Sequence, residues 1–285
     1  MRLIAVLALA FCLCETPAEA QDEWRSPSPE LLERAKRLLT EVPLIEGHND
    51  LPSRLLDLEG GDPVAADLMR RQHHLPADIP RLREGMVGAQ FWSAYVHVDS
   101  MLAGTALRHG IRQIDMIRRL VEAYDDLELA SSADDIEEAF GRGRIASLIG
   151  LEGGHALGGS LSALRMFHDL GVRYVTLTHW ATTSWADAAT DAPRHGGLSA
   201  LGEDMIREMN RLGVFADISH VSEETMRDVL RVSEAPVIFS HSSARAINAH
   251  PRNVPDGVLR MMPDNGGVVM VNFYAGYVPP AGPAW

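Results

Sequence analysis

The sequence has little cysteine and almost no lysine. Both cysteines, Cys12 and Cys14, lie in the first 14 residues, and Lys36 is the only lysine among 26 basic residues. If the N-terminal segment is removed, no thiol remains, which excludes disulfides, cysteine metal sites and cysteine nucleophiles. The formal charge of −13 argues against nucleic-acid binding, because phosphate neutralisation needs clustered basic side chains. The hydrophobic content of 46% is too high for a disordered chain.

Long apolar runs are also missing, apart from one near the start. Residues 3–14 are apolar, follow Arg2, and precede Ala18-Glu19-Ala20, which has the spacing of a signal-peptidase site. This run is too short to span a bilayer comfortably. We therefore predict a signal peptide over residues 1–20 and an exported protein, periplasmic or secreted, with no stable membrane anchor after cleavage. An N-terminal anchor helix is the alternative.

The rest of the chain alternates short apolar runs with helical patterns. Residues 21–43 are predicted to form a linker and a helix that starts at Ser28-Pro29. After them, seven strands are expected to end near residues 47, 96, 151, 178, 219, 240 and 273. The main helices are expected over residues 106–127, 134–140, 162–170, 200–212, 223–232 and 254–262. This alternation predicts an α/β fold with a parallel sheet covered by helices.

Polar residues recur at the C-terminal ends of several predicted strands. Active sites of (β/α)8 barrels are built at that position, so we favour a barrel over an open sheet. The prediction is a TIM-type (β/α)8 barrel of the metallo-dependent hydrolase kind over residues 44–285. A closed barrel needs eight strands, and the sequence after Phe273 carries no further strand signal. The barrel is therefore expected to be truncated before its eighth strand and incomplete at its C-terminus.

His48 and Asp50 form the first candidate metal-binding pair. Residues two apart on a strand share a face, so both side chains can reach one cation at a barrel mouth. Imidazole and carboxylate are good ligands for zinc and similar divalent metals. Taken alone, however, a His-x-Asp pair is more typical of a solvated loop.

Glu152, His220 and His241 extend this candidate site. Glu152 ends an apolar strand, where a carboxylate is costly unless it is paired or bound to metal. A salt bridge to an arginine is the alternative for Glu152. His220 and His241 end consecutive predicted strands, which would place the two imidazoles side by side, and His179 ends the strand before them.

Together these residues indicate two metals that share a bridging carboxylate. Such a centre activates a hydroxide and polarises a carbonyl. Many barrel hydrolases bridge their metals with a carboxylated lysine, but Lys36 lies before the first predicted strand. If there is a bridge, Glu152 must provide it. Arg252, in a predicted loop, could hold a substrate carboxylate, although a solvated surface charge is an equal alternative.

Several motifs, in order, resemble the membrane (renal) dipeptidase family of binuclear zinc metallopeptidases. The resemblance runs through nearly all of residues 44–277. The motifs are Gly-His-Asn-Asp-Leu-Pro (47–52), Gly-Ala-Gln-Phe-Trp-Ser (88–93), Gly-Leu-Glu-Gly-Gly-His (150–155), Tyr-Val-Thr-Leu-Thr-His (174–179), Asp-Ile-Ser-His-Val-Ser (217–222), Pro-Val-Ile-Phe-Ser-His-Ser-Ser-Ala (236–244), Arg-Asn-Val-Pro-Asp (252–256) and Val-Met-Val-Asn-Phe-Tyr (269–274).

The resemblance implies a metal-binding role for each candidate ligand. His48 and Asp50 would bind one zinc ion, and His220 and His241 would bind the other. Glu152 would bridge the two ions. A hydroxide bridging the metals would attack the peptide carbonyl, which implies a hydrolase acting in proteolysis of dipeptides.

The resemblance also implies residues that act on the substrate. His179, besides Glu152, would be catalytic, because it would stabilise the developing oxyanion. Arg252 would hold the free C-terminal carboxylate of a dipeptide, and Tyr277 would line the substrate pocket. The implied partner is a dipeptide, and self-association to a homodimer is left open.

Two departures from the family pattern qualify this interpretation. Ser53 stands where some members carry tryptophan, so the side-chain preference is open. The family's last strand ends in a Gly-Gly-Asp-Phe-Asp-Gly-like motif, which this sequence does not contain. The competing hypothesis is therefore a catalytically impaired or inactive truncated member that still binds metal. A third is a different barrel hydrolase, such as a deaminase or lactonase.

Overall fold

The computed structural model describes residues 27–58 and 60–278 of the chain. The predicted signal peptide, residues 1–20, lies outside the described residues. The chain divides into two units, and the described part of the first contains helix α1 (Pro29–Glu41). Its start follows Ser28, whose hydroxyl accepts a hydrogen bond from the backbone N–H of Leu31 at 3.3 Å. The second unit begins at Val42 and contains all the strands.

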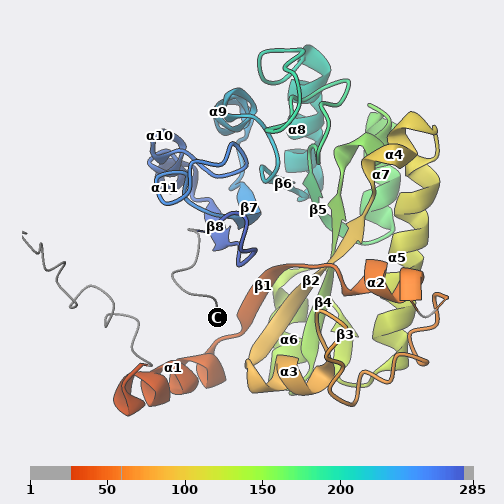
Figure 1. Ribbon diagram of the computed structural model, residues 1–285, viewed down its shortest axis with the longest axis vertical. Coiled ribbons are helices and arrows are strands. Elements are labelled where there is room, and N and C mark those ends of the chain that lie inside the picture. Colours follow the sequence, from red (N-terminus) through yellow and green to blue (C-terminus); the bar gives the residue numbers. More distant parts are fainter. Residues whose placement is uncertain (1–26, 59, 279–285) are drawn as a thin grey trace, which may run out of the picture. The chain divides into compact units, whose positions relative to one another are not determined.

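The second unit is built on a parallel sheet (Figure 1). Seven strands pair in the order β1-β2-β4-β5-β6-β7-β8, and the short strand β3 pairs with the first residues of β4. The parallel α/β fold predicted from the sequence is confirmed. The strands are β1 (Leu44–Asn49), β2 (Val87–Tyr95), β3 (Leu127–Leu129), β4 (Ile145–Glu152), β5 (Val172–Thr176), β6 (Phe215–Asp217), β7 (Ile238–Ser242) and β8 (Val268–Val271).

Helices follow most strands and lie on the outside of the sheet (Figure 1). Serine side chains cap several of them: Ser132, Ser160, Ser199 and Ser222 accept hydrogen bonds from backbone N–H groups of the first turn. The helices are α2 (Leu51–Leu58), α3 (Ile79–Glu84), α4 (Val98–Leu102), α5 (Ala106–Ala123), α6 (Ala133–Gly141), the 3₁₀ helix η2 (Gly154–Leu157), α7 (Leu161–Asp169), α8 (Ala200–Leu212), α9 (Glu223–Val232), α10 (Asp256–Leu259) and α11 (Met262–Asn265).

The sheet curls so far that strands from opposite ends of the pairing order meet. The rings of His48 on β1 and His241 on β7 stack with their centroids 3.9 Å apart. At Gly47 the approach is so close that an added Cβ would overlap the carbonyl oxygen of Ser240. Among the described residues no hydrogen-bonded pairing joins β1 to β8. The strands therefore form most of a TIM-type barrel, with seven strands in its path as predicted.

Two predicted helix boundaries are wrong. The helix expected over 106–127 ends at Ala123, because residues 127–129 pair with β4 instead. Leu127 lies seven residues after Leu120 and both are buried, so helical periodicity alone does not reveal the end. The helix expected over 254–262 is two short helices, α10 and α11. The short helices α2, α3 and α4 were not expected from the sequence.

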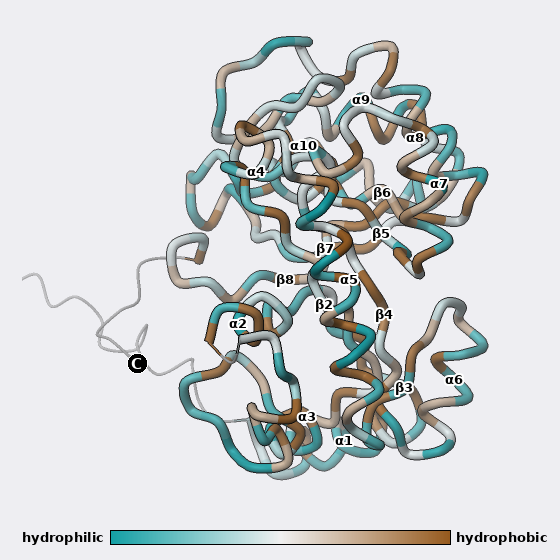
Figure 2. Tube along the Cα trace, turned by 90° about the vertical axis from the view of Figure 1, so that its right-hand side faces the viewer, coloured by the Kyte–Doolittle hydropathy of each residue, from teal (hydrophilic) through white to brown (hydrophobic). Residues whose placement is uncertain are grey.

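The core lies between the strands and the helices that cover them. Strand β4 is buried along its whole length, and the hydropathy colouring of Figure 2 is mostly brown there. Trp92 and Trp185 are among the largest fully buried side chains. In the part of the chain that the structure describes, no helix is both long enough and apolar enough to cross a lipid bilayer.

Candidate metal centre

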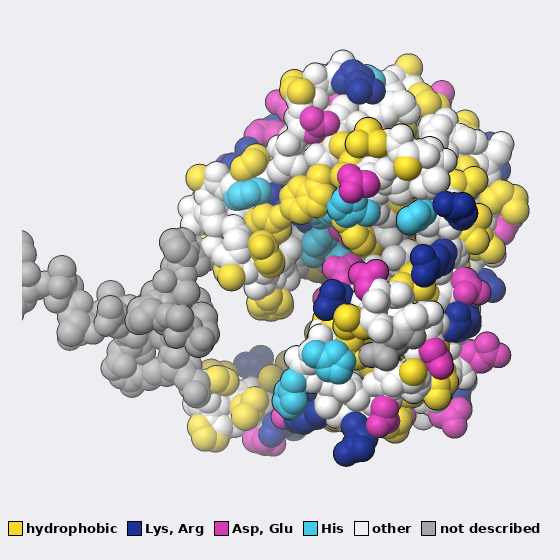
Figure 3. All heavy atoms as spheres, turned by 45° about the vertical axis from the view of Figure 1, so that its right-hand side comes forward, with side chains coloured by type: hydrophobic (Ala, Val, Ile, Leu, Met, Phe, Trp, Pro, Cys, Tyr) yellow, Lys and Arg dark blue, Asp and Glu magenta, His cyan; other side chains and the backbone are white. Residues whose placement is uncertain are grey.

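The predicted ligands meet in a cavity of about 690 Å³ at the C-terminal ends of the strands. Figure 3 shows histidine and acidic side chains gathered beside a hollow in the surface. Histidine and carboxylate side chains form the floor, while aromatic and polar side chains complete the walls. The lining residues include His48, Asp50, Glu152, His179, His220, His241, Ser53, Arg54, Tyr95, Trp180, Phe273, Tyr274 and Tyr277.

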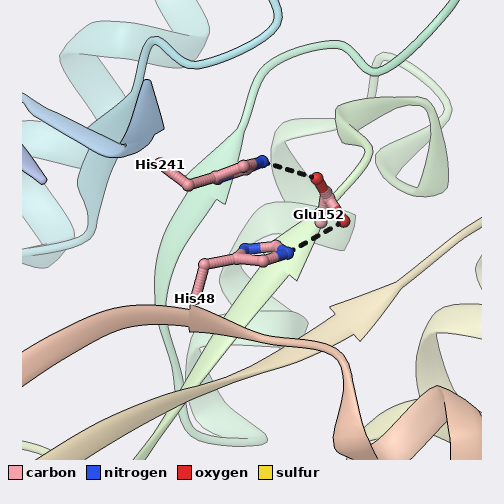
Figure 4. A group of neighbouring side chains, drawn as sticks. All are labelled: His48, Glu152 and His241. Carbon is pink, nitrogen blue, oxygen red and sulfur yellow. Dashed lines mark ion pairs between the residues drawn. The ribbon is translucent and has the colours of Figure 1, made fainter. Parts of the chain in front are cut away.

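Glu152 is the centre of the site. It is the last residue of β4, and only 3% of its surface is exposed. Its Oε2 lies 3.4 Å from Nε2 of His48, and its Oε1 lies 3.2 Å from Nε2 of His220 and 3.3 Å from Nε2 of His241. Figure 4 shows the rings of His48 and His241 side by side, both directed at this carboxylate. The described contacts of Glu152 include no arginine, so the salt-bridge alternative is not observed there.

His48 and Asp50 approach Glu152 from the first strand. Nε2 of His48 lies 3.4 Å from Oδ1 of Asp50, so the donor atoms of the predicted pair lie close together. The two environments differ: the His48 side chain is nearly buried, whereas half of the Asp50 side chain is exposed. Asp50 therefore stands at the solvent side of the site, and His48 belongs to its floor.

His220 and His241 come together as the strand order requires. Their Nε2 atoms are 3.0 Å apart. His220 lies three residues beyond β6 with a φ of +68°, a left-handed conformation that is uncommon for a residue with a side chain. Its carbonyl accepts hydrogen bonds from Oγ1 of Thr178 at 3.0 Å and from N–H of Ala189 at 2.8 Å. These two bonds hold the turn that aims His220 at Glu152.

The charges of the site balance around Glu152. Burial alone would raise the pKa of Glu152, but the surrounding histidines, His48 first, lower it well below its usual range. Burial would lower the pKa of His48, yet Glu152 raises it well above its usual range. Burial lowers the pKa of His179, that of His220 strongly, and that of His241 to about 4. The lowered pKa values favour neutral rings at His179, His220 and His241, which is the form in which a histidine binds a divalent metal.

Two groups of three donor atoms could each hold a metal ion. The first is His48, Glu152 and His241, and the second is Glu152, His179 and His220, with ligand atoms within 4.8 Å of one another. Glu152 belongs to both, as expected of a shared ligand. The grouping differs from the expected pairs, because His241 joins His48 and His179 joins His220. These donors fit zinc or a similar divalent cation.

Arg252 is neither exposed nor in the cavity wall. It is 1% exposed, and its terminal nitrogens donate to Oγ of Ser242 and to the carbonyl oxygen of His241, both at 2.6 Å. The alternative of a solvated surface charge is therefore excluded. Its guanidinium carbon lies 5.7 Å from the ring centre of Tyr277, which does line the cavity. Arg252 thus lies behind the site and contacts it through Tyr277 and His241.

Sequence reasoning missed the buried polar side chains that hold the histidines. The hydroxyl of Tyr174 lies 3.0 Å from Nδ1 of His48, and Oγ of Ser240 lies 2.8 Å from Nδ1 of His241. Asp217 bonds to Ser240 in turn. The only signal for Asp217 was a carboxylate inside an apolar strand, which demands a partner. No local sequence pattern marks Tyr174 or Ser240 as a partner of a histidine.

A protein-family comparison agrees with this geometry. The family model for membrane dipeptidase, peptidase family M19, matches residues 32–284. The chain belongs to this family. The resemblance stated from the motifs is thereby confirmed.

Curated relatives of this M19 chain include two dipeptidases from mammals. Dipeptidase 3 of Mus musculus is 44% identical over 253 residues, and Dipeptidase 3 of Homo sapiens is 45% identical over 249 residues. The matches cover 87% and 85% of this chain, and 50% of each relative. The chain therefore spans about half the length of the curated relatives that it matches.

Solved structures confirm the barrel fold of the M19 chain. A metallopeptidase from Rhodobacter sphaeroides, liganded with a phosphinate mimic of the dipeptide L-Ala-D-Ala, has a TM-score of 0.73 at 25% identity, covering 84% of this chain and 76% of that one. Dipeptidase AC, a metallopeptidase of family M19, has a TM-score of 0.75 at 26% identity, covering 84% of this chain and 74% of that one.

Proposed function

We propose that the chain is a zinc-dependent dipeptidase whose two metal ions share Glu152. The observation that carries this proposal is the position of the Glu152 carboxylate. One of its oxygens faces His48, and the other faces His220 and His241. A buried carboxylate with donors on both sides is suited to link two cations.

His179 would act on the substrate beside the metal ions. When bound, the metal ions supply Lewis acidity and lower the pKa of water. Burial lowers the pKa of His179, which favours the neutral ring, and a neutral imidazole keeps one N–H to donate. Nε2 of His179 lies 3.9 Å from Oε1 of Glu152, at the edge of the candidate metal centre. His179 would therefore stabilise the negative charge that develops on the oxygen of the substrate carbonyl.

Arg252 and Tyr277 would recognise the substrate's free carboxylate. Tyr277 lines the cavity and contacts the Arg252 guanidinium. The Nε of Arg252 has no hydrogen-bond partner among the described residues, whereas both terminal nitrogens are engaged. In this role the Arg252 charge attracts the carboxylate, and Nε is the nitrogen that remains available to donate to it. A dipeptide carries its free carboxylate one residue from the scissile bond, and Arg252 would select for this feature.

The metal content of the full chain tests the centre. After loading with Zn²⁺, the wild type should bind about two ions per chain by elemental analysis, and Glu152→Ala should lose the second. Glu208→Ala is the matched control, because Glu208 pairs with Arg165 and Arg211 instead of with site residues. Two ions retained in Glu152→Ala would contradict the bridging role.

Hydrolysis of small peptides tests the reaction. The panel comprises L-Ala-L-Ala, L-Ala-D-Ala, tri-alanine, a dipeptide amide, a lactone and an aminopurine, each with the zinc-loaded chain. Cleavage of dipeptides with little cleavage of tri-alanine supports the proposal. Zinc binding without turnover would instead support the catalytically impaired family member, and turnover only of a lactone or an aminopurine would support another barrel hydrolase.

Export is the localisation that we propose for this activity. It rests on the apolar run at residues 3–14 and on Ala18-Glu19-Ala20, which precede the described residues. Expressed in a Gram-negative host, the chain should be recovered from the periplasm with Gln21 as its first residue. A cytoplasmic product that starts at Met1 would contradict the proposal.

A further inference from the structure

Asp217 is a fully buried carboxylate at the end of β6. Among residues 27–58 and 60–278 it forms no ion pair with an arginine, lysine or histidine within 4.0 Å. A buried charge without a counter-charge is costly unless hydrogen bonds satisfy its lone pairs. The structure provides four such bonds, and their donors come from three neighbouring strands or the turns that follow them.

The donors to Asp217 are divided evenly between its two oxygens. Oδ1 accepts from the backbone N–H of Ser219 at 3.1 Å and from that of Ser240 at 2.9 Å. Oδ2 accepts from Oγ1 of Thr176 at 2.5 Å and from Oγ of Ser240 at 2.7 Å. Asp217 thus ties together β5 and β6, which precede His179 and His220, and β7, which contains His241.

Ser240 links Asp217 to His241, one of the proposed metal ligands. Its Oγ lies 2.8 Å from Nδ1 of His241 as well as 2.7 Å from Asp217. A serine hydroxyl has a single proton to donate, and an ionised carboxylate can only accept. Because that proton goes to Asp217, Ser240 must accept from Nδ1–H of His241. The other ring nitrogen, Nε2, then carries a lone pair on the side of the ring that faces Glu152, where a bound cation would accept it.

We infer that Asp217 and Ser240 are positioning residues that fix His241 in its Nδ1–H tautomer, so that Nε2 presents a lone pair to a divalent cation. The inference rests on the metal centre proposed above. It deepens that proposal, because a metal-ligating histidine is oriented by what its other nitrogen contacts. His220 provides a contrast, since its buried Nδ1 has no partner among the described residues.

The first test measures the tautomer directly in the zinc-loaded full chain, because without a cation the Glu152 carboxylate, 3.3 Å from Nε2 of His241, itself favours a proton on that nitrogen. Two-bond ¹H–¹⁵N correlation spectra distinguish a histidine protonated at Nδ1 from one protonated at Nε2. His241 is expected to be protonated at Nδ1 at neutral pH. The Nε2–H form at His241 would overturn the inference. The measurement uses the wild-type chain, so it does not depend on whether a variant folds.

The second test measures zinc affinity by competition with a chelator. Ser240→Ala removes the acceptor of the His241 proton, and Asp217→Asn gives Ser240 a donor in place of an acceptor. Both variants should bind Zn²⁺ about 10- to 100-fold more weakly. Ser240→Thr keeps the hydroxyl and should stay close to the wild type. A purely structural network would lower stability in these variants and leave the affinity unchanged.

Asp78→Asn is the matched control for losing a buried carboxylate. Asp78 is also fully buried, but its partners are Gln72 and Arg81, neither of which lies at the site. This variant should lose stability and keep the zinc affinity of the wild type. If the wild type itself binds no zinc, the proposed function fails. If the wild type binds zinc and Ser240→Ala and Asp217→Asn match it within twofold, only the positioning role fails.

Discussion

The hydroxyl of Tyr174 lies 3.0 Å from Nδ1 of His48, although the two residues are 126 positions apart in the chain. The tyrosine reaches His48 across the barrel interior because Gly150 leaves the space free. A Cβ at position 150 would overlap the tyrosine ring. His48 and His241 are thus each held at Nδ1 by a hydroxyl group, and each directs Nε2 toward Glu152.

Tyr174→Phe should weaken zinc binding and leave the fold in place. The change removes only the hydroxyl that bonds to His48, so zinc affinity should fall about 10-fold. Chelator competition on the full chain provides the measurement. Tyr124→Phe is the control, because its hydroxyl bonds to Pro63 and Leu68, away from the site. Equal zinc affinity in the two variants would show that Tyr174 does not orient His48.

Gly150→Ala should destabilise the protein through overpacking. The new methyl group overlaps the ring of Tyr174, and both residues lie in buried strands. Forcing such a group into a packed core costs about 1–3 kcal/mol, to be measured by urea unfolding. Gly141→Ala is the control, since no other atom lies within 4 Å of its added Cβ, and this variant should be neutral or slightly stabilised. A Gly150→Ala variant as stable as the wild type would mean that the ring has room to move.

The sequence predicted the barrel and the cluster of candidate ligands because both depend on local signals. Apolar runs predicted the seven strands, and a histidine or carboxylate at a strand end predicted a place in the barrel mouth. The network beneath the ligands depends on packing between strands. Asp217 meets Thr176 and Ser240 at sequence separations of 41 and 23 residues, which no local pattern encodes. Arg252 shows the same limit, because its burial results from contacts with β7.

Asp187 should make stability depend on pH in the acid range. Burial alone would raise its pKa, but backbone N–H groups of residues 194–197 donate to it and lower the pKa below the usual 3.8. The stability gained from this carboxylate is complete above the unfolded-state pKa and is lost as the pH falls through the lower native pKa. Asp187→Asn should therefore cost about 2–3 kcal/mol at pH 7.

That difference between wild type and Asp187→Asn should shrink steadily as the pH falls below 3.8. Urea unfolding of the zinc-free proteins at several pH values measures it. Asp125→Asn, at an exposed position, should change stability by less than about 0.5 kcal/mol throughout. A difference that stays constant down to strongly acidic pH would show that the Asp187 charge does not hold this loop.

Arg252→Lys should separate recognition of the substrate carboxylate from support of His241. The substitution keeps a positive charge but loses the planar group that bonds to Ser242 and to the carbonyl of His241. If Arg252 holds the carboxylate, kcat/KM for a dipeptide should fall about 10- to 100-fold, since a hydrogen bond to a charged group contributes about 1.5–3 kcal/mol. The corresponding dipeptide amide, which has no carboxylate, should lose much less. Zinc affinity should stay within twofold of the wild type. An equal loss for dipeptide and amide, together with weaker zinc binding, would instead make Arg252 a support for the end of β7.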